Sequence, residues 1–135
     1  KPITVIGICC PNDTVMVLSG GYNLTQKEQE SIQKRIDEHF AQVNRHFNFV
    51  FRYFDTEYDL LYFFLSVFVP KMAMMTGWNF EEYDWRYIFN RAKKLGIDPS
   101  IASPSRILTG QFDRPAHVGL IDYLKAYKKW TWNKL

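Results

Sequence analysis

Apolar residues recur at helical spacing in the middle of the chain, directly after a short apolar run. Residues 73–76 predict a strand buried in the centre of a sheet, and Gly77 begins a polar turn. An amphipathic helix is expected over residues 84–95, with an acid, Asp84, at its start. Its apolar face consists of Trp85, Ile88, Phe89, Ala92 and Leu95. In open α/β sheets, ligands bind at such a junction of strand, turn and helix.

Three further strands are expected from β-branched and aromatic residues. They cover residues 3–10, 15–18 and 49–54. A turn at residues 11–13 favours an antiparallel hairpin of the first two. The predicted class is therefore α/β, a mixed sheet flanked by helices.

Two sequences of the capping-box type predict helix starts. Thr25 with Glu28, and Thr56 with Asp59, have the spacing at which side chains satisfy the first backbone amides. The first helix is expected to end near Asn44 and the second at Pro70. Residues 98–119 predict a long irregular loop, and residues 118–132 predict a strand or a short helix.

Composition favours one folded domain over residues 1–135. Hydrophobic residues make up 47%, charged residues 23%, and the net charge is +3, which permits nucleic-acid binding without requiring it. No apolar run is long enough to span a membrane, and no secretion signal is visible, so we expect no membrane partner and a cytoplasmic location. Because the sequence starts at Lys1 without Met, we expect a fragment of a longer protein.

The stretch from Gly77 to Arg91 resembles a motif of a known family. Gly-Trp-Asn, three residues and Tyr-Asp, followed by Tyr-Ile and Asn-Arg, is similar to the second exonuclease motif of family B DNA polymerases, above all their phage branch. Residues 120–130 resemble a later segment of that branch, so the likeness covers about residues 2–132. It implies a ribonuclease H-like fold, here lacking its first strand. It also implies a partial 3′-5′ proofreading exonuclease domain. The expected location is the cytoplasm of a bacterial or phage-infected cell.

The resemblance also implies which residues act. Asp84 corresponds to a catalytic carboxylate that binds metal, and Asn79 and Tyr83 correspond to positions near the terminal nucleotide of a single strand. The cofactor would be Mg²⁺ or Mn²⁺, two ions in the full-length parent. The partners would be a single-stranded DNA 3′ end and the remaining polymerase domains. Arg106, on the predicted loop, is a candidate phosphate contact, although a plain exposed role is equally consistent.

Two of the family's acidic motifs are not found in this chain. The first, Asp-x-Glu, would lie upstream of Lys1, and the last, Tyr-(three residues)-Asp, downstream of Leu135. The letters Asp55-Thr56-Glu57 spell the first motif, but their position directly before a capped helix favours a helix N-terminus. One carboxylate cannot hold two ions, so we expect the fragment alone to be inactive.

Several alternatives stay open. Asp84 could be a helix cap, Asn79 a turn residue, and Tyr83 part of the core. For the whole chain, one alternative is a non-catalytic nucleic-acid-binding or interaction module on the same fold. Another is a related exonuclease that acts on RNA. A sheet without its first strand would also expose an edge, which favours self-association.

Overall fold

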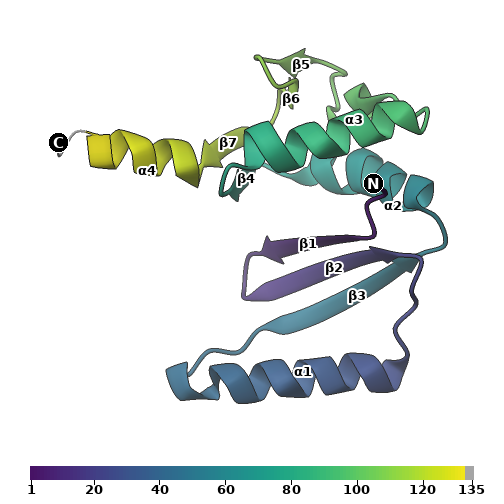
Figure 1. The fold of residues 1–135 in the computed structure, drawn as a ribbon, viewed down its shortest axis with the longest axis vertical. Helices are drawn as coiled ribbons and strands as arrows, with labels where there is room; N and C mark the ends of the chain where they lie inside the picture. The colour runs from purple at the N-terminus through teal and green to yellow at the C-terminus, as the bar shows by residue number, and fades with distance from the viewer. Residues whose placement is uncertain (133–135) are drawn as a thin grey trace. The chain divides into compact units, whose positions relative to one another are not determined.

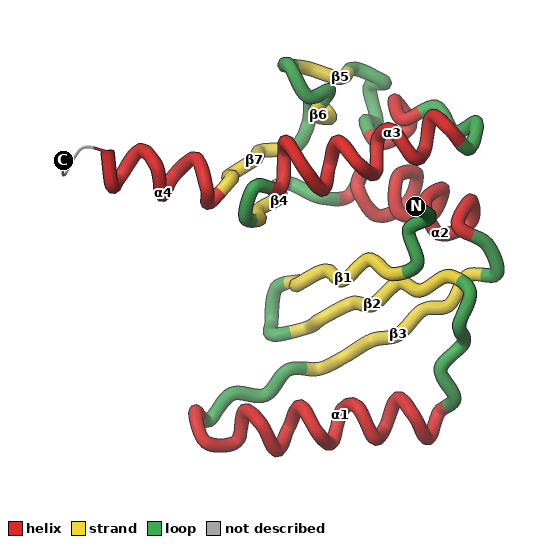
Figure 2. Tube along the Cα trace, in the orientation of Figure 1, coloured by secondary structure: helices red, strands yellow, loops and turns green. Residues whose placement is uncertain are grey.

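The computed structural model describes residues 1–132, which divide into two compact units. The first unit comprises residues 1–60 and the second begins at residue 61. Both units contain strands and helices (Figures 1 and 2). The α/β class with a mixed sheet is confirmed, and it is consistent with a ribonuclease H-like domain. The expected single domain over residues 1–135 stays a prediction.

The first unit contains a mixed three-stranded sheet. β1 (Val5–Cys10) and β2 (Thr14–Gly20) form the predicted antiparallel hairpin, and β3 (Asn48–Phe54) pairs with β2 in parallel. The hairpin turn has Asn12 and Asp13 at φ 62° and 52°, a left-handed conformation that Asn and Asp adopt more easily than most residues. A parallel pair needs a crossover connection, and the helix between β2 and β3 supplies it.

That crossover helix, α1 (Gln26–Phe40), is capped as the sequence predicts. The Thr25 hydroxyl accepts a hydrogen bond from the Glu28 amide at 3.2 Å. A 3₁₀ turn (Ala41–Val43) follows, and Asn44 ends it in the left-handed region with φ 52°. No residue of α1 is fully buried, so its apolar stripe covers the sheet only partly.

Gln33 of α1 makes the polar contact between this helix and β3. Its side-chain Nε2 donates to the Phe47 carbonyl at 2.7 Å, and its Oε1 accepts from the Phe49 amide at 2.9 Å. These two backbone groups face away from β2, so the Gln33 amide binds the outer edge of β3 as a neighbouring strand would. Figure 1 shows α1 alongside this strand.

The second predicted capping box is also confirmed. The Thr56 hydroxyl accepts from the Asp59 amide at 3.1 Å, and α2 (Glu57–Phe63) begins there. Glu57 is therefore the first residue of a helix, which agrees with the helix-start interpretation of Asp55-Thr56-Glu57. Helical backbone continues through a π-helical turn (Phe64–Phe68) and a 3₁₀ turn (Val69–Lys71), one residue beyond Pro70.

The second unit differs from expectation in its strands. β4 (Met74–Gly77) was expected in the centre of a sheet, but within residues 1–132 it pairs only with β7 (Gly119–Asp122), in parallel. The apolar run was misleading because Met75 alone is buried, whereas Met74 is 57% exposed. The predicted loop over residues 98–119 instead contains a 3₁₀ turn (Pro99–Ala102) and a small hairpin of β5 (Leu108–Thr109) and β6 (Arg114–Pro115).

The helix after β4 begins earlier than expected. Phe80–Trp85 form a π-helical segment, and α3 (Arg86–Lys94) continues it. Asp84 therefore lies inside helical backbone, and the helix-cap interpretation of Asp84 is wrong. Residues 118–132 form both predicted elements, β7 and then α4 (Tyr123–Trp132).

The core of the second unit lies mainly between its helical segments, with Met75 contributed by β4. Its buried residues include Leu61, Leu65, Val69, Met75, Trp85, Ile88, Ala92, Ile97, Ala102 and Val118. Within the described part of the chain, no helix has the length and apolar character needed to cross a bilayer.

Replacement of Gln33 tests the link between α1 and β3. Gln33→Ala removes both hydrogen bonds to the strand edge, and we expect a loss of about 1–3 kcal/mol in the free energy of unfolding. Guanidinium unfolding followed by circular dichroism measures it. Gln26→Ala is the matched control, since the Gln26 side chain bonds Glu30 of the same helix at the surface. An equal loss in both variants would contradict the role given to Gln33.

Candidate functional site

The parallel pairing of β4 and β7 brings the ends of two distant segments together. The register places Gly77, the last residue of β4, opposite Asp122, the last residue of β7. Both strands run in the same direction, so the turn after β4 and the start of α4 lie at one edge of this sheet. The candidate site is built at this edge.

The turn after β4 requires two particular residues. A Cβ atom on Gly77 would lie 2.7 Å from Cβ of Phe80, a distance that real side chains do not adopt, so glycine alone fits. Asn79 has φ 54° and ψ 28°, in the left-handed region, where Asn is among the residues best tolerated. Backbone geometry therefore explains the Gly and the Asn of the Gly-Trp-Asn sequence.

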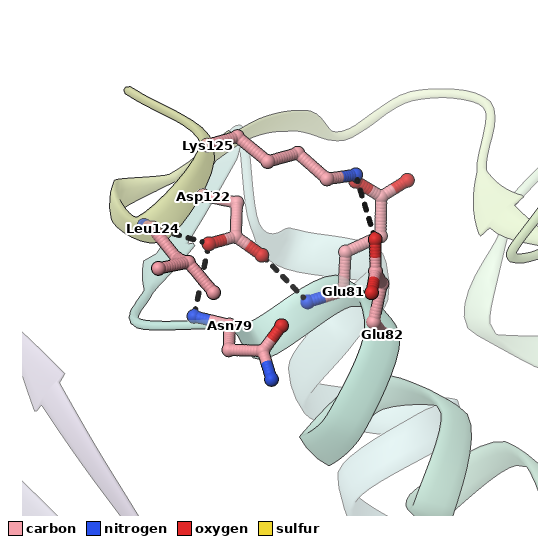
Figure 3. A network of polar contacts seen from close by, with 6 residues as sticks. All are labelled: Asn79, Glu81, Glu82, Asp122, Leu124 and Lys125. Carbon is pink, nitrogen blue, oxygen red and sulfur yellow. Dashed lines mark hydrogen bonds and ion pairs between the residues drawn. The ribbon is translucent and has the colours of Figure 1, made fainter. Parts of the chain in front are cut away.

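The Asp122 carboxylate connects this turn to the end of β7. Its Oδ1 accepts from the amides of Asn79, at 2.9 Å, and Leu124, at 3.0 Å (Figure 3). Its Oδ2 accepts from the amide of Glu81 at 3.3 Å. Asp122 is only 6% exposed, so these three donors replace the water that its charge would otherwise require.

Lys125 lies beside this network and pairs with the acids of the turn. Its Nζ donates to Glu81 Oε2 at 2.9 Å and lies 3.9 Å from Glu82 Oε1 (Figure 3). The hydrogen bond to Glu81 raises the pKa of Lys125, and the charges of Glu81, Glu82 and Asp122 add to this effect against partial burial. The Glu81 side chain is only 19% exposed and is paired with Lys125.

The segment Phe80–Trp85 presents Glu82, Tyr83 and Asp84 to solvent next to a buried residue, Trp85. Trp85 is 1% exposed, and its Nε1 donates to the Asp113 carbonyl at 3.3 Å. Its neighbours Tyr83 and Asp84 are exposed, Tyr83 by 68%. The alternative of Tyr83 as a core residue is therefore wrong. In the described part of the chain, neither a hydrogen bond nor an ion pair engages the Asp84 carboxylate.

A complete metal site is not formed by the described residues. Carboxylate oxygen is the ligand that Mg²⁺ prefers, and Asp84 offers one such group. However, residues 1–132 contain no group of three or more His, Cys, Asp or Glu side chains placed to hold an ion. Asp122 does not add a ligand, because backbone amides occupy both of its oxygens. The chain thus fits one position of a metal site.

The structure brings three of the four predicted residues into one segment. Asn79 starts it and donates its amide to Asp122, whereas its side chain is directed away from that carboxylate (Figure 3). Tyr83 and Asp84 follow on its solvent side. Arg106 lies elsewhere in this unit, exposed at a turn with φ 62°, and none of the contacts described here joins it to the segment. The functional roles of all four stay predictions.

Sequence reasoning did not identify Asp122 as part of the site. Its three partners are backbone amides, two of them more than 40 residues away, and backbone donors leave no residue pattern. The available signal was local: an acid ends an apolar strand directly before a helix, where Asp is favoured as a cap.

Known proteins resemble the chain over most of its length. The family model described as "DNA polymerase family B, exonuclease domain" matches residues 1–127. A DNA-directed DNA polymerase of Enterobacteria phage T4 is 32% identical over 95 residues, a match that covers 61% of this chain and 11% of the polymerase. The chain thus spans about a tenth of the length of this curated relative. Both findings agree with the resemblance that the Gly77–Arg91 sequence carries.

Substitution of Gly77 tests the geometry of the turn. Gly77→Ala places a Cβ against the rigid Cβ of Phe80, so we expect a loss of about 1–3 kcal/mol in the free energy of unfolding from overpacking. Chemical denaturation measures the loss. Gly7→Ala is the control, because a Cβ at Gly7 meets no atom within 4 Å. If Gly77→Ala is as stable as the Gly7 variant, the turn is less constrained than the contacts indicate.

Proposed function

This chain belongs to the exonuclease domain family of family B DNA polymerases, and we propose that it is part of a proofreading 3′-5′ exonuclease that hydrolyses the terminal phosphodiester of single-stranded DNA. The observation that carries the proposal is the Asp84 carboxylate, which is exposed and without a partner in the described chain. It lies on helical backbone that is anchored in the core by Trp85. A nuclease needs a carboxylate of this kind, accessible to an ion but fixed in direction.

Exonuclease domains of this family generally use divalent metals. In our proposal the full-length parent binds two Mg²⁺ or Mn²⁺ ions, and Asp84 supplies one of the ligands. Such ions activate a water molecule and stabilise the leaving oxygen of the phosphodiester. The other carboxylates would come from parts of the parent outside this chain. The role of Asp84 is to present a negatively charged oxygen at the edge of the β4–β7 sheet.

The exposed residues around Asp84 suit a single-stranded DNA end. The Tyr83 ring is 68% exposed and offers a face on which an unpaired base can stack. The Asn79 carboxamide is not used by the Asp122 network, so it is available to the terminal nucleotide (Figure 3). Arg106 is proposed as a phosphate contact on the strength of its charge and exposure alone.

The partners follow from the length of the relative. Since the chain corresponds to about a tenth of a DNA polymerase, we propose that the other polymerase domains are its main protein partners. Self-association through a free sheet edge, and a cytoplasmic location in a bacterial or phage-infected cell, belong to the same proposal.

A second function is favoured by one observation. Because the described residues do not assemble three metal-binding side chains, the chain itself would act as a non-catalytic nucleic-acid-binding module if its parent also lacked the other carboxylates. The same fold would then keep the Tyr83 surface without hydrolysis. Cleavage assays separate the two functions.

We predict that the isolated 135-residue chain does not degrade DNA. One carboxylate cannot hold two ions, so a 5′-labelled single strand incubated with the chain and Mg²⁺ should stay at its original length on a denaturing gel. A parallel incubation with an RNA strand of the same sequence tests whether the chain cleaves RNA. Rapid shortening that disappears in Asp84→Ala would contradict this prediction.

In the full-length polymerase, Asp84→Asn should reduce excision of a 3′ nucleotide by at least about 100-fold, the scale of losing a group that acts in the transition state. Single-turnover excision from single-stranded DNA measures it, and primer extension checks that polymerisation is retained. Glu38→Gln, which neutralises an exposed acid of α1, is the control. Normal excision by Asp84→Asn would refute the proposed function.

A further inference from the structure

We propose that Asp122 is a positioning residue for Asp84: it fixes the start of the helical segment that carries the catalytic acid, without binding metal itself. The inference rests on the proposed function of Asp84. Asp122 is 38 positions later in the sequence than Asp84. The pairing of β4 with β7 nevertheless brings it into contact with the turn that leads to Asp84.

A chain of hydrogen bonds connects Asp122 to the residue before Asp84. Asp122 Oδ1 accepts from the Asn79 amide at 2.9 Å, and the Asn79 carbonyl accepts from the Tyr83 amide at 3.1 Å. Asp122 Oδ2 holds the Glu81 amide between them. The first turn of the segment Phe80–Trp85 is therefore bound to the end of β7 by the Asp122 side chain, which accepts from backbone amides of the turn.

The other end of the segment is fixed by Trp85. Its indole is 1% exposed and donates to the Asp113 carbonyl. Asp84 lies between these two anchors, so the direction of its side chain depends on both. The segment has no side-chain cap of its own at Asn79, and Asp122 takes that place from a different element.

Asp122 is assigned to positioning because its oxygens are already occupied. Both accept backbone hydrogen bonds, and the side chain is 6% exposed, so an ion would have to displace these amides from a buried carboxylate. Asp84 has the opposite properties, being exposed and without a partner in residues 1–132. Two acids close to one turn thus have separate roles, one holding the backbone and the other facing the substrate.

Two substitutions separate the contacts of Asp122. Asp122→Ser keeps a short acceptor for the nearby Leu124 amide but cannot reach Asn79 or Glu81. Asp122→Asn keeps an oxygen at the Oδ1 position and presents an NH₂ group to the Glu81 amide. Glu38→Gln is the control, because it neutralises an exposed acid whose carboxylate makes none of these bonds.

The first readout is amide hydrogen exchange in the 135-residue chain, which requires neither metal nor activity. In Asp122→Ser, the amides of Asn79 and Glu81 should exchange at least about tenfold faster, while amides of the β2–β3 pair keep their rates. In Asp122→Asn the increase should be confined mainly to Glu81. Unchanged exchange at Asn79 and Glu81 in Asp122→Ser would overturn the proposal.

The second readout is single-turnover excision by the full-length polymerase. Asp122→Ser should lower the rate of excision per folded molecule about 10- to 100-fold, as loss of a supporting residue around a metal ligand typically does, with the KM for single-stranded DNA within about twofold. Asp122→Ser in an Asp84→Asn background should add little further loss. A purely structural role would instead lower the amount of folded enzyme and leave its rate per molecule unchanged, and that result would overturn the proposal.

The two proposals fail in different ways. If Asp84→Asn excises normally, the proposed function is wrong whatever Asp122 does. If Asp84→Asn is inactive but Asp122→Ser excises at the normal rate, Asp84 is catalytic and the positioning role of Asp122 is wrong.

Discussion

The arrangement at the candidate site depends on one buried charge. Asp122 is carried inward by the pairing of two four-residue strands, and a buried carboxylate is costly unless donors surround it. Three backbone amides supply the donors, two of them from the turn after β4. That turn cannot move away without leaving the charge unsatisfied, so its path is tied to the end of β7. Gly77 and the left-handed Asn79 are the residues that make this path sterically possible.

In both units, a polar side chain of one element forms hydrogen bonds to the backbone of another and so joins the two. In the first unit, Gln33 binds the edge of β3, and this matters because α1 buries no residue completely. In the second unit, Asp122 joins β7 to the turn after β4. Both contacts act between segments distant in sequence, and both use groups whose geometry is fixed by regular structure. A modest hydrophobic core is supplemented in this way by directional bonds that specify register.

Local signals in the sequence predicted much of the fold. The β1–β2 hairpin, β3 and the caps at Thr25 and Thr56 depend on neighbouring residues, and all were predicted correctly. Asp84 is exposed, which is consistent with the metal-binding position that it has in the exonuclease-like motif. The place of β4 was not predictable, because an apolar run of four residues does not reveal how many neighbours a strand has. The early start of the helix at Phe80 was missed because a π-helical turn does not show the 3.6-residue periodicity on which the prediction was based. Asp122 was missed because its contacts exist only once β4 and β7 have paired.

The π-helical backbone of Phe80–Trp85 has a consequence for how this site can vary among related proteins. A π-helical turn is an α-helix with one additional residue in it, so its removal would restore ordinary α-helix. Each residue of an α-helix turns the chain by about 100°, so a single deletion between Asn79 and Asp84 would rotate Asp84 and Trp85 together by about that angle relative to the turn that Asp122 holds. Spacing in this segment is therefore expected to be more strictly preserved than residue type. Relatives with many substitutions here can keep the function, whereas a relative one residue shorter would have its acid on a different side of the helix.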